Sequence, residues 1–129
     1  MAEGIIDAKT LRDMLEHGER ATVLDVRKAE DRAEWAIPGS IHFDAYEALK
    51  AKDEKAVEGV DAPDGVPVET VCNAGKTSAI AAEQLRRRGY EAVSLEGGMK
   101  AWSMAWNSAE VDVTGTDAGV LQVRRTGKG

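Results

Sequence analysis

Short apolar runs alternate with helical stretches along most of this chain of 129 residues, and this alternation constrains the fold more than any other feature. The runs with the length and composition of buried strands are residues 21–26, 41–43, 68–72 and 91–95. Strands that alternate with helices predict an α/β fold, with a mainly parallel central sheet and helices on both faces.

Helix signals fill the gaps between these strands. Asp7 is a candidate N-cap for a first helix, which Gly18 ends. Further helices are expected over residues 44–50, 78–88 and 99–106. Residues 51–67 combine many charges with two prolines and two glycines, so a surface loop is predicted there.

The end of the chain differs in composition from the rest. Residues 107–129 are rich in Gly, Thr, Asp and Val and contain one candidate strand, residues 120–125. We therefore predict a domain over residues 1–106, followed by a C-terminal linker or tail over residues 107–129 that packs loosely.

Charge and cysteine content exclude several classes of function. The formal net charge of −6 repels nucleic-acid phosphates and argues against a DNA or RNA partner. The apolar runs are too short to cross a membrane, and the first residues lack the pattern of a signal peptide, so a cytoplasmic protein is expected. A single cysteine excludes an internal disulfide and a multi-cysteine zinc site. No metal or cofactor is expected.

That single cysteine, Cys72, stands where a strand gives way to a helix. Ligands of open α/β sheets bind at the carboxyl ends of strands, and a short loop there can point its N–H groups at an anion. Gly75 permits such a loop, the next helix adds its N-terminal dipole, and Lys76 adds a charge. We expect a partly exposed thiol with a lowered pKa and a substrate held by the residues after it, namely Asn73, Ala74, Gly75, Lys76, Thr77 and Ser78. The alternative is an inert, buried cysteine that only fills the core.

Three segments resemble the signatures of the rhodanese family. Cys72-x-x-Gly75-Lys76-Thr77 is similar to the six-residue active-site loop of that family. The N-terminal signature is matched by Leu24-Asp25-Val26-Arg27, by Glu30 and Asp31, and by Ile37-Pro38-Gly39-Ser40-Ile41. The C-terminal signature is matched by Leu95-Glu96-Gly97-Gly98-Met99 and then Trp102. The order and spacing agree over roughly residues 4–106.

The resemblance implies a three-layer rhodanese-like fold and a sulfurtransferase. The Cys72 thiolate would take the outer sulfur of thiosulfate or an organic persulfide and pass it to cyanide or a thiol. The partners implied are thus small sulfur donors and acceptors. Asp25 and Arg27 would support the rim of the site, although a purely structural ion pair is the reading that we favour.

The chain departs from the family pattern at a few positions. Arg32 stands where an aromatic residue is usual, and Trp35-Ala36 replaces the usual Gly-His before the Ile-Pro-Gly turn. Asn73 occupies a position that is often basic, which leaves Lys76 as the only charge in the loop.

Two other functions compete with this interpretation. Phosphatases of similar fold use Cys-x5-Arg, but Ser78 stands where that arginine belongs, and lysine is a poor substitute for its planar fork. The second alternative is a non-catalytic sulfur-relay or regulatory module. It is suggested by residues 120–129, which resemble the entry strand of a metallo-β-lactamase-type domain. Such a domain would be fused to this one or would be its partner. The chain has no His-x-His-x-Asp-His metal motif of its own.

Overall fold

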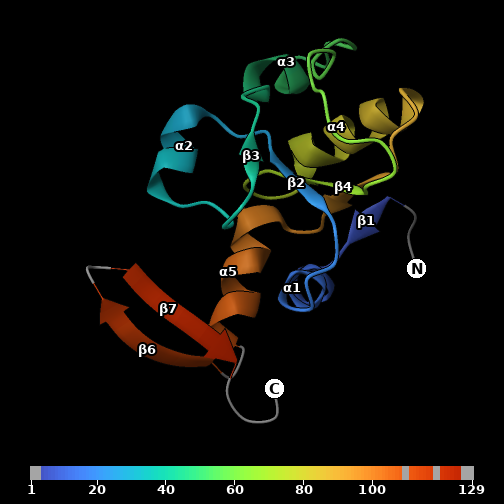
Figure 1. The fold of residues 1–129 in the computed structure, drawn as a ribbon. Coiled ribbons are helices and arrows are strands. Elements are labelled where there is room, and N and C mark those ends of the chain that lie inside the picture. Colours follow the sequence, from blue (N-terminus) through green and yellow to red (C-terminus); the bar gives the residue numbers. More distant parts are fainter. Residues whose placement is uncertain (1–3, 109–110, 118–119, 126–129) are drawn as a thin grey trace.

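A five-stranded, fully parallel sheet forms the centre of the protein (Figure 1). The computed structural model describes residues 4–108, 111–117 and 120–125, with side chains through residue 105. The strands are β1 (Ile5–Ile6), β2 (Thr22–Asp25), β3 (Ile41–His42), β4 (Val68–Val71) and β5 (Ala92–Leu95). Their order across the sheet is β1-β5-β4-β2-β3, so β4 is the central strand.

Helices cover both faces of this sheet. They are α1 (Ala8–Glu16), α2 (Ala29–Glu34), α3 (Tyr46–Lys50), α4 (Lys76–Arg87) and α5 (Gly98–Ser108). Side chains of α1 and α5 join one buried cluster, and side chains of α3 and α4 join the other. The short helix α2 buries none of its residues and lies near the β3 edge (Figure 1). The predicted α/β fold with a parallel sheet between helices is therefore confirmed.

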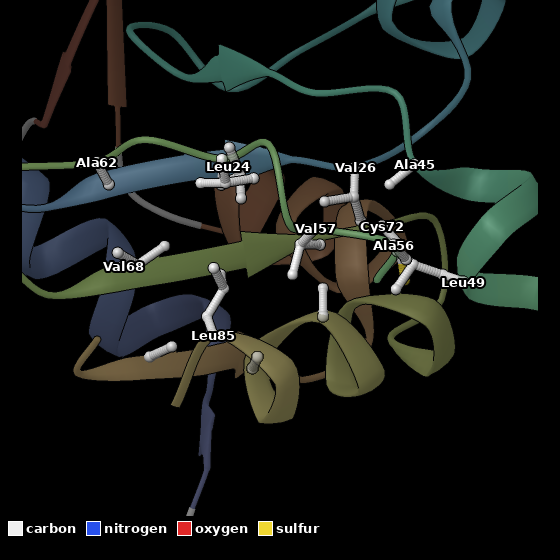
Figure 2. Close-up of a cluster of buried hydrophobic side chains, with 14 residues drawn as sticks. Leu24, Val26, Ala45, Leu49, Ala56, Val57, Ala62, Val68, Cys72 and Leu85 are labelled. Atoms are coloured by element: carbon white, nitrogen blue, oxygen red, sulfur yellow. The ribbon is translucent and has the colours of Figure 1, made fainter. Parts of the chain in front are cut away.

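The two buried clusters lie on opposite faces because neighbouring residues of a strand point to opposite sides. In β2, Val23 packs with α1 and α5, whereas Leu24 packs with α3 and α4. Figure 2 draws the α3/α4 cluster, in which Leu85 of α4 lies beneath β4. Cys72 belongs to this same cluster, so the residue that follows β4 is anchored in the core.

The segment before β4 differs from its prediction. Residues 51–67 were predicted to form a surface loop, which is wrong for their apolar members, since Ala56, Val57, Val60 and Ala62 are buried in the α3/α4 cluster. The backbone is also fixed, because Arg88 donates to the carbonyls of Val57 and Val60 at 2.7 and 2.9 Å. The charged residues of this segment are exposed, and these four alanines and valines face the core. The prolines and glycines in the same segment indicated a loop, so this inward pattern was not recognised.

Two further differences concern the ends of the chain. Strand β1 was not predicted, because two residues are too few for a periodic signal, yet Ile5 pairs with Ser94 of β5. After α5, the chain forms a separate antiparallel hairpin of β6 (Val111–Asp117) and β7 (Val120–Arg125), where a single strand was expected. Residues 109–110, 118–119 and 126–129 lie outside the described part, and the domain boundary near residue 106 stays a prediction. None of the described helices is long and apolar enough to cross a membrane.

Glu69 is an unusual residue for the centre of the sheet. It lies in β4 between Val23 and Val93, its side chain is 1% exposed, and its Oε1 has no hydrogen-bond partner. Burial, with a smaller contribution from the negative charge of Glu91, raises the pKa of Glu69 to about 7 from its ordinary 4.5. The folded protein therefore holds this proton more tightly than the unfolded chain does.

We predict that the Glu69→Gln variant loses part of the pH dependence of folding. Between about pH 4.5 and 7 the unfolded chain has released the proton that the folded protein keeps, so wild-type stability falls as pH rises through this window. Glutamine stays neutral at every pH, so the decrease in Tm between pH 5 and pH 8 should shrink. Thermal unfolding at several pH values measures this decrease.

The matched control is Glu19→Gln at an exposed position, which should retain the wild-type decrease. If the decrease in Tm between pH 5 and pH 8 were the same in Glu69→Gln as in the wild type, Glu69 would not be a buried, protonated carboxyl. This conclusion holds whatever the absolute Tm of the variant.

Candidate active site

A tight loop joins β4 to α4 and carries the only cysteine. Cys72 follows the last residue of β4, and α4 begins at Lys76, two residues earlier than predicted. Gly75 caps the helix in a left-handed conformation, with φ of +98°, which L side chains rarely adopt. This backbone turn brings the first turn of α4 back over the cysteine.

The sulfur of Cys72 lies within hydrogen-bonding distance of several groups in this loop. The backbone N–H groups of Gly75 and Ser78 donate to Sγ at 3.0 and 3.3 Å. The hydroxyl of Ser78 lies 3.3 Å from Sγ and donates to it when the sulfur is a thiolate. The loop thus points backbone and side-chain donors at one atom, as a site for negative charge requires.

Two opposing effects set the pKa of the Cys72 thiol. Burial raises it, but the hydrogen bonds of the Ser78 and Thr77 side chains and of the Ser78 and Gly75 backbones outweigh burial, so the pKa lies below its ordinary value. The expected direction is therefore found, although the contributions come from hydrogen bonds and not from Lys76. The side chain of Lys76 is exposed.

A second hydroxyl group lies next to that of Ser78. Ser94 of β5 is 1% exposed, and its Oγ lies 2.7 Å from Oγ of Ser78. The two hydroxyls can rotate together, so that Ser94 donates to Ser78 while Ser78 donates to a Cys72 thiolate. Two buried serines therefore form a short polar chain that ends on the sulfur of Cys72.

The first turn of α5 holds the other side of the loop. The N–H groups of Met99 and Lys100 donate to the carbonyls of Cys72 and Asn73 at 2.8 and 3.2 Å. A Cβ on Gly98 would lie 2.2 Å from the Cys72 carbonyl oxygen, so only glycine allows this approach. The Gly97-Gly98 pair, which belongs to the C-terminal signature, is therefore a packing surface for the loop that carries Cys72.

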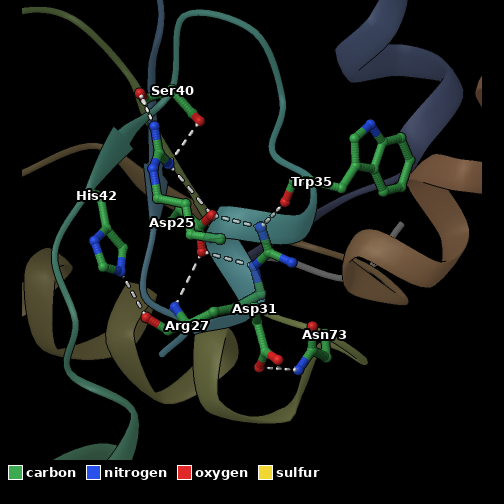
Figure 3. Close-up of polar contacts among 8 residues, drawn as sticks. Asp25, Arg27, Asp31, Trp35, Ser40, His42 and Asn73 are labelled. Atoms are coloured by element: carbon green, nitrogen blue, oxygen red, sulfur yellow. Dashed lines mark hydrogen bonds and ion pairs between the residues drawn. The ribbon is translucent and has the colours of Figure 1, made fainter. Parts of the chain in front are cut away.

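Helix α2 contacts the loop through Asn73. The amide of Asn73 donates to the carboxylate of Asp31 at 3.0 Å (Figure 3). Position 73 thus carries a neutral side chain that binds a carboxylate of the same chain.

The predicted supporting pair is a buried ion pair at the end of β2. Asp25 and Arg27 are buried, and Nε and Nη2 of Arg27 donate to the two carboxylate oxygens at 3.0 and 2.8 Å. The backbone N–H of Arg27 also donates to Asp25 at 3.0 Å, and Arg32 adds a fourth bond to this carboxylate at 3.3 Å. Arg32 also binds both the hydroxyl and the carbonyl of Ser40 (Figure 3). Arg32 thus fixes the turn before β3 through polar contacts.

A cavity of about 360 Å³ opens beside Cys72, between α3 and α4. Of the predicted loop residues, Asn73, Ala74, Lys76 and Thr77 line it together with Cys72. Gly75 and Ser78 face the sulfur instead. The expectation of a partly exposed Cys72 is wrong, because the residue is 3% exposed, although it forms part of the cavity wall. Close packing by α4 and α5 explains this burial.

Several residues of the site escaped prediction. Asp31 belongs to a signature segment that gives no sign of its contact with Asn73, and Ser94 carries no signal, because a serine in a strand has many uses. Tyr46, Leu49, Lys50 and Ile80 line the cavity from α3 and α4, which no local motif could reveal. Among the residues with described side chains, no cluster of three or more potential metal ligands is present.

Known proteins resemble this chain in sequence and in fold. The family model described as "Rhodanese-like domain" matches residues 7–105. The chain is 31% identical over 100 residues to the Bacillus subtilis protein named "Putative sulfurtransferase YtwF", which covers 75% of this chain and 87% of that protein. The human single-domain sulfurtransferase TSTD1 has a TM-score of 0.61 and 26% identity, covering 80% of this chain and 97% of its own. A rhodanese-related protein of Thermoplasma volcanium has a TM-score of 0.61 and 26% identity, covering 77% and 89%.

We predict that Ser78→Ala raises the pKa of the Cys72 thiol. The change removes the hydroxyl next to Sγ and leaves the backbone N–H groups in place, so the thiolate loses one donor. Ser94→Ala should produce a smaller shift in the same direction, because Ser94 acts only through Ser78. The rate of alkylation by iodoacetamide, measured against pH, gives the midpoint for each variant.

Ser40→Ala is the matched control, since its hydroxyl binds Arg32 and not the sulfur. If the midpoint of Ser78→Ala coincided with that of Ser40→Ala, the hydroxyl would have no part in setting the acidity of the thiol.

Proposed function

Because the chain belongs to the rhodanese-like domain family, whose model spans residues 7–105, we propose that it is a sulfurtransferase that carries the transferred sulfur on Cys72. Relatives named as sulfurtransferases support this reaction at the level of the family. The observation that carries the proposal is the position of Sγ, which accepts hydrogen bonds from the loop while Cys72 lines an open cavity.

The reaction has two sulfur-transfer steps. The Cys72 thiolate attacks the outer sulfur of thiosulfate or of an organic persulfide, a new S–S bond forms, and the donor leaves as sulfite or as a thiolate with the electron pair of the broken bond. The acceptor, a thiolate or cyanide, then attacks the same outer sulfur and releases the Cys72 thiolate. Because the nucleophile is already stabilised as an anion, the loop needs no histidine base. A reducing compartment such as the cytoplasm keeps this thiol available.

Lys76 has a separate role in this proposal. Its side chain is exposed at the cavity, and the hydrogen bonds that lower the pKa of the thiol come from other residues, so the charge of Lys76 serves to attract anionic donors.

A non-catalytic sulfur relay within a longer protein is the second candidate. The chain matches 77 residues of a tRNA sulfurtransferase from Desulfurococcus amylolyticus at 32% identity, but it covers only 14% of that protein. Domains of this kind therefore occur as parts of larger chains. A relay would form the same Cys72 persulfide but would not turn over with small acceptors.

We predict that Cys72→Ser abolishes sulfur transfer and leaves the fold intact. A serine hydroxyl is not ionised at neutral pH and holds no transferable sulfur. Intact-mass spectrometry after treatment with a persulfide donor should show one added sulfur on the wild type and none on the variant. Thiosulfate:cyanide and persulfide:thiol assays should show turnover for the wild type alone. Activity retained in Cys72→Ser would refute the mechanism.

For Lys76 we predict a graded loss. Lys76→Ala should lower kcat/KM for thiosulfate by roughly two- to fivefold, because an exposed charge contributes only modestly. A neutral persulfide donor should lose less, and Lys76→Arg should keep much of the activity. Lys9→Ala, an exposed lysine on α1, serves as the control. An equal loss for charged and neutral donors would refute this role of Lys76 but not the role of Cys72.

A further inference from the structure

The cavity beside Cys72 is large for an inorganic donor. Its volume of about 360 Å³ lies within the range of roughly 300–1,000 Å³ that is typical of sites for organic ligands. A thiosulfate ion would occupy only the part next to the sulfur. The remaining space lies between α3 and α4, away from the loop that activates the thiol.

The walls of that remaining space are mainly apolar. Leu49 of α3 and Ile80 of α4 contribute aliphatic side chains, and Tyr46 contributes its ring. The ring is held in place by two lysines, since Nζ of Lys28 lies 4.9 Å and Nζ of Lys50 lies 5.6 Å from its centroid. Such a surface favours a ligand with an apolar body.

The charged residues that line the cavity have one sign. Lys50 of α3 and Lys76 of α4 both line it, and the lining contains no aspartate or glutamate. Both lysines are exposed and come from the two helices that flank the space. An anionic group on a ligand would thus lie between two cations. A cationic group would find no acidic side chain in the lining to balance its charge.

We infer that the physiological partner of Cys72 is a small organic thiol, or its persulfide, with an apolar chain and an anionic group at the far end from its sulfur. The apolar chain lies along Leu49, Ile80 and Tyr46, and the anion faces Lys50. This inference rests on the proposed sulfur transfer and specifies the class of molecule that takes part in it.

The chemical step remains balanced for such a partner. Its thiolate attacks the outer sulfur of the Cys72 persulfide and forms a new S–S bond. The S–S bond to Cys72 breaks, and Cys72 leaves as a thiolate with the electron pair. No oxidant or reductant is consumed, because the outer sulfur moves between two thiolates.

A single-turnover experiment on the full chain tests the inference. Inorganic polysulfide first loads Cys72, and intact mass verifies one added sulfur. Mercaptoacetate, 6-mercaptohexanoate and 6-mercaptohexanol are then compared as acceptors at equal thiolate concentration, by the rate at which the added mass disappears. We expect 6-mercaptohexanoate to react at least about tenfold faster than mercaptoacetate, because its added methylenes are buried. It should also react roughly two- to fivefold faster than the neutral 6-mercaptohexanol.

Two variants test which residues cause the preference for a long chain and the preference for a carboxylate. Ile80→Ser should reduce the advantage of the long chain over the short one, and Lys50→Gln should reduce the advantage of the carboxylate over the alcohol. Ile41→Ser and Lys9→Gln are the matched controls at exposed positions outside the cavity, and both should keep the wild-type ratios.

The outcomes separate this inference from the proposed function. Failure of Cys72 to load sulfur would refute the sulfurtransferase itself. Normal loading with equal rates for the three acceptors would refute the amphiphilic partner and leave the sulfurtransferase standing. The wild-type comparison decides this point even if a variant does not fold.

Discussion

The hydrogen bonds from the first turn of α4 to the sulfur of Cys72 are the interaction on which the site depends. They exist only because Gly75 reverses the chain at φ of +98° and lets the N–H groups of Gly75 and Ser78 converge on Sγ at 3.0 and 3.3 Å. The reversal leaves the carbonyl of Cys72 pointing the other way, where the N–H of Met99 binds it. Two helix N-termini therefore hold one peptide segment from opposite sides, and the close approach of Gly98 makes the second of them fit.

The buried ion pair beside the loop contributes geometry more than stability. Asp25 and Arg27 are almost fully buried, and removing two charges from water offsets most of the attraction between them. The pair nevertheless fixes the end of β2, since Arg27 also donates to the carbonyl of Trp35 after α2. Because α2 carries the Asp31 that binds Asn73, a chain of polar contacts runs from the strand end to the active-site loop.

Local patterns predicted much of this molecule, and the rest depends on contacts between distant segments. The strand that precedes Cys72, the loop after it and the helix beyond were predictable, because Gly75 and the change from strand to helix period are local signals. The acidity of the thiol was predicted in direction, but its main source was misjudged, because only the folded loop brings the hydroxyls of Ser78 and Thr77 to Sγ. The burial of Cys72, the inward residues of the 51–67 segment and the α3 wall of the cavity arise from packing across the sheet, which no local pattern encodes.

The use of hydrogen bonds instead of a buried cation suits the proposed sulfur transfer, in which the sulfur of Cys72 is nucleophile and leaving group in turn. The intrinsic nucleophilicity of a thiolate falls as its pKa falls, while its ability to leave improves, so an extreme shift would favour one step at the expense of the other. Burial of Cys72 raises the pKa of the thiol and the hydrogen-bond donors lower it, so the two effects oppose each other and the donors prevail. The same hydrogen-bond donors stabilise the Cys72 thiolate when it attacks the sulfur donor and again when it leaves. The positive charge of Lys76, kept at the exposed rim, can then attract an anionic donor without over-stabilising the sulfur that has to react.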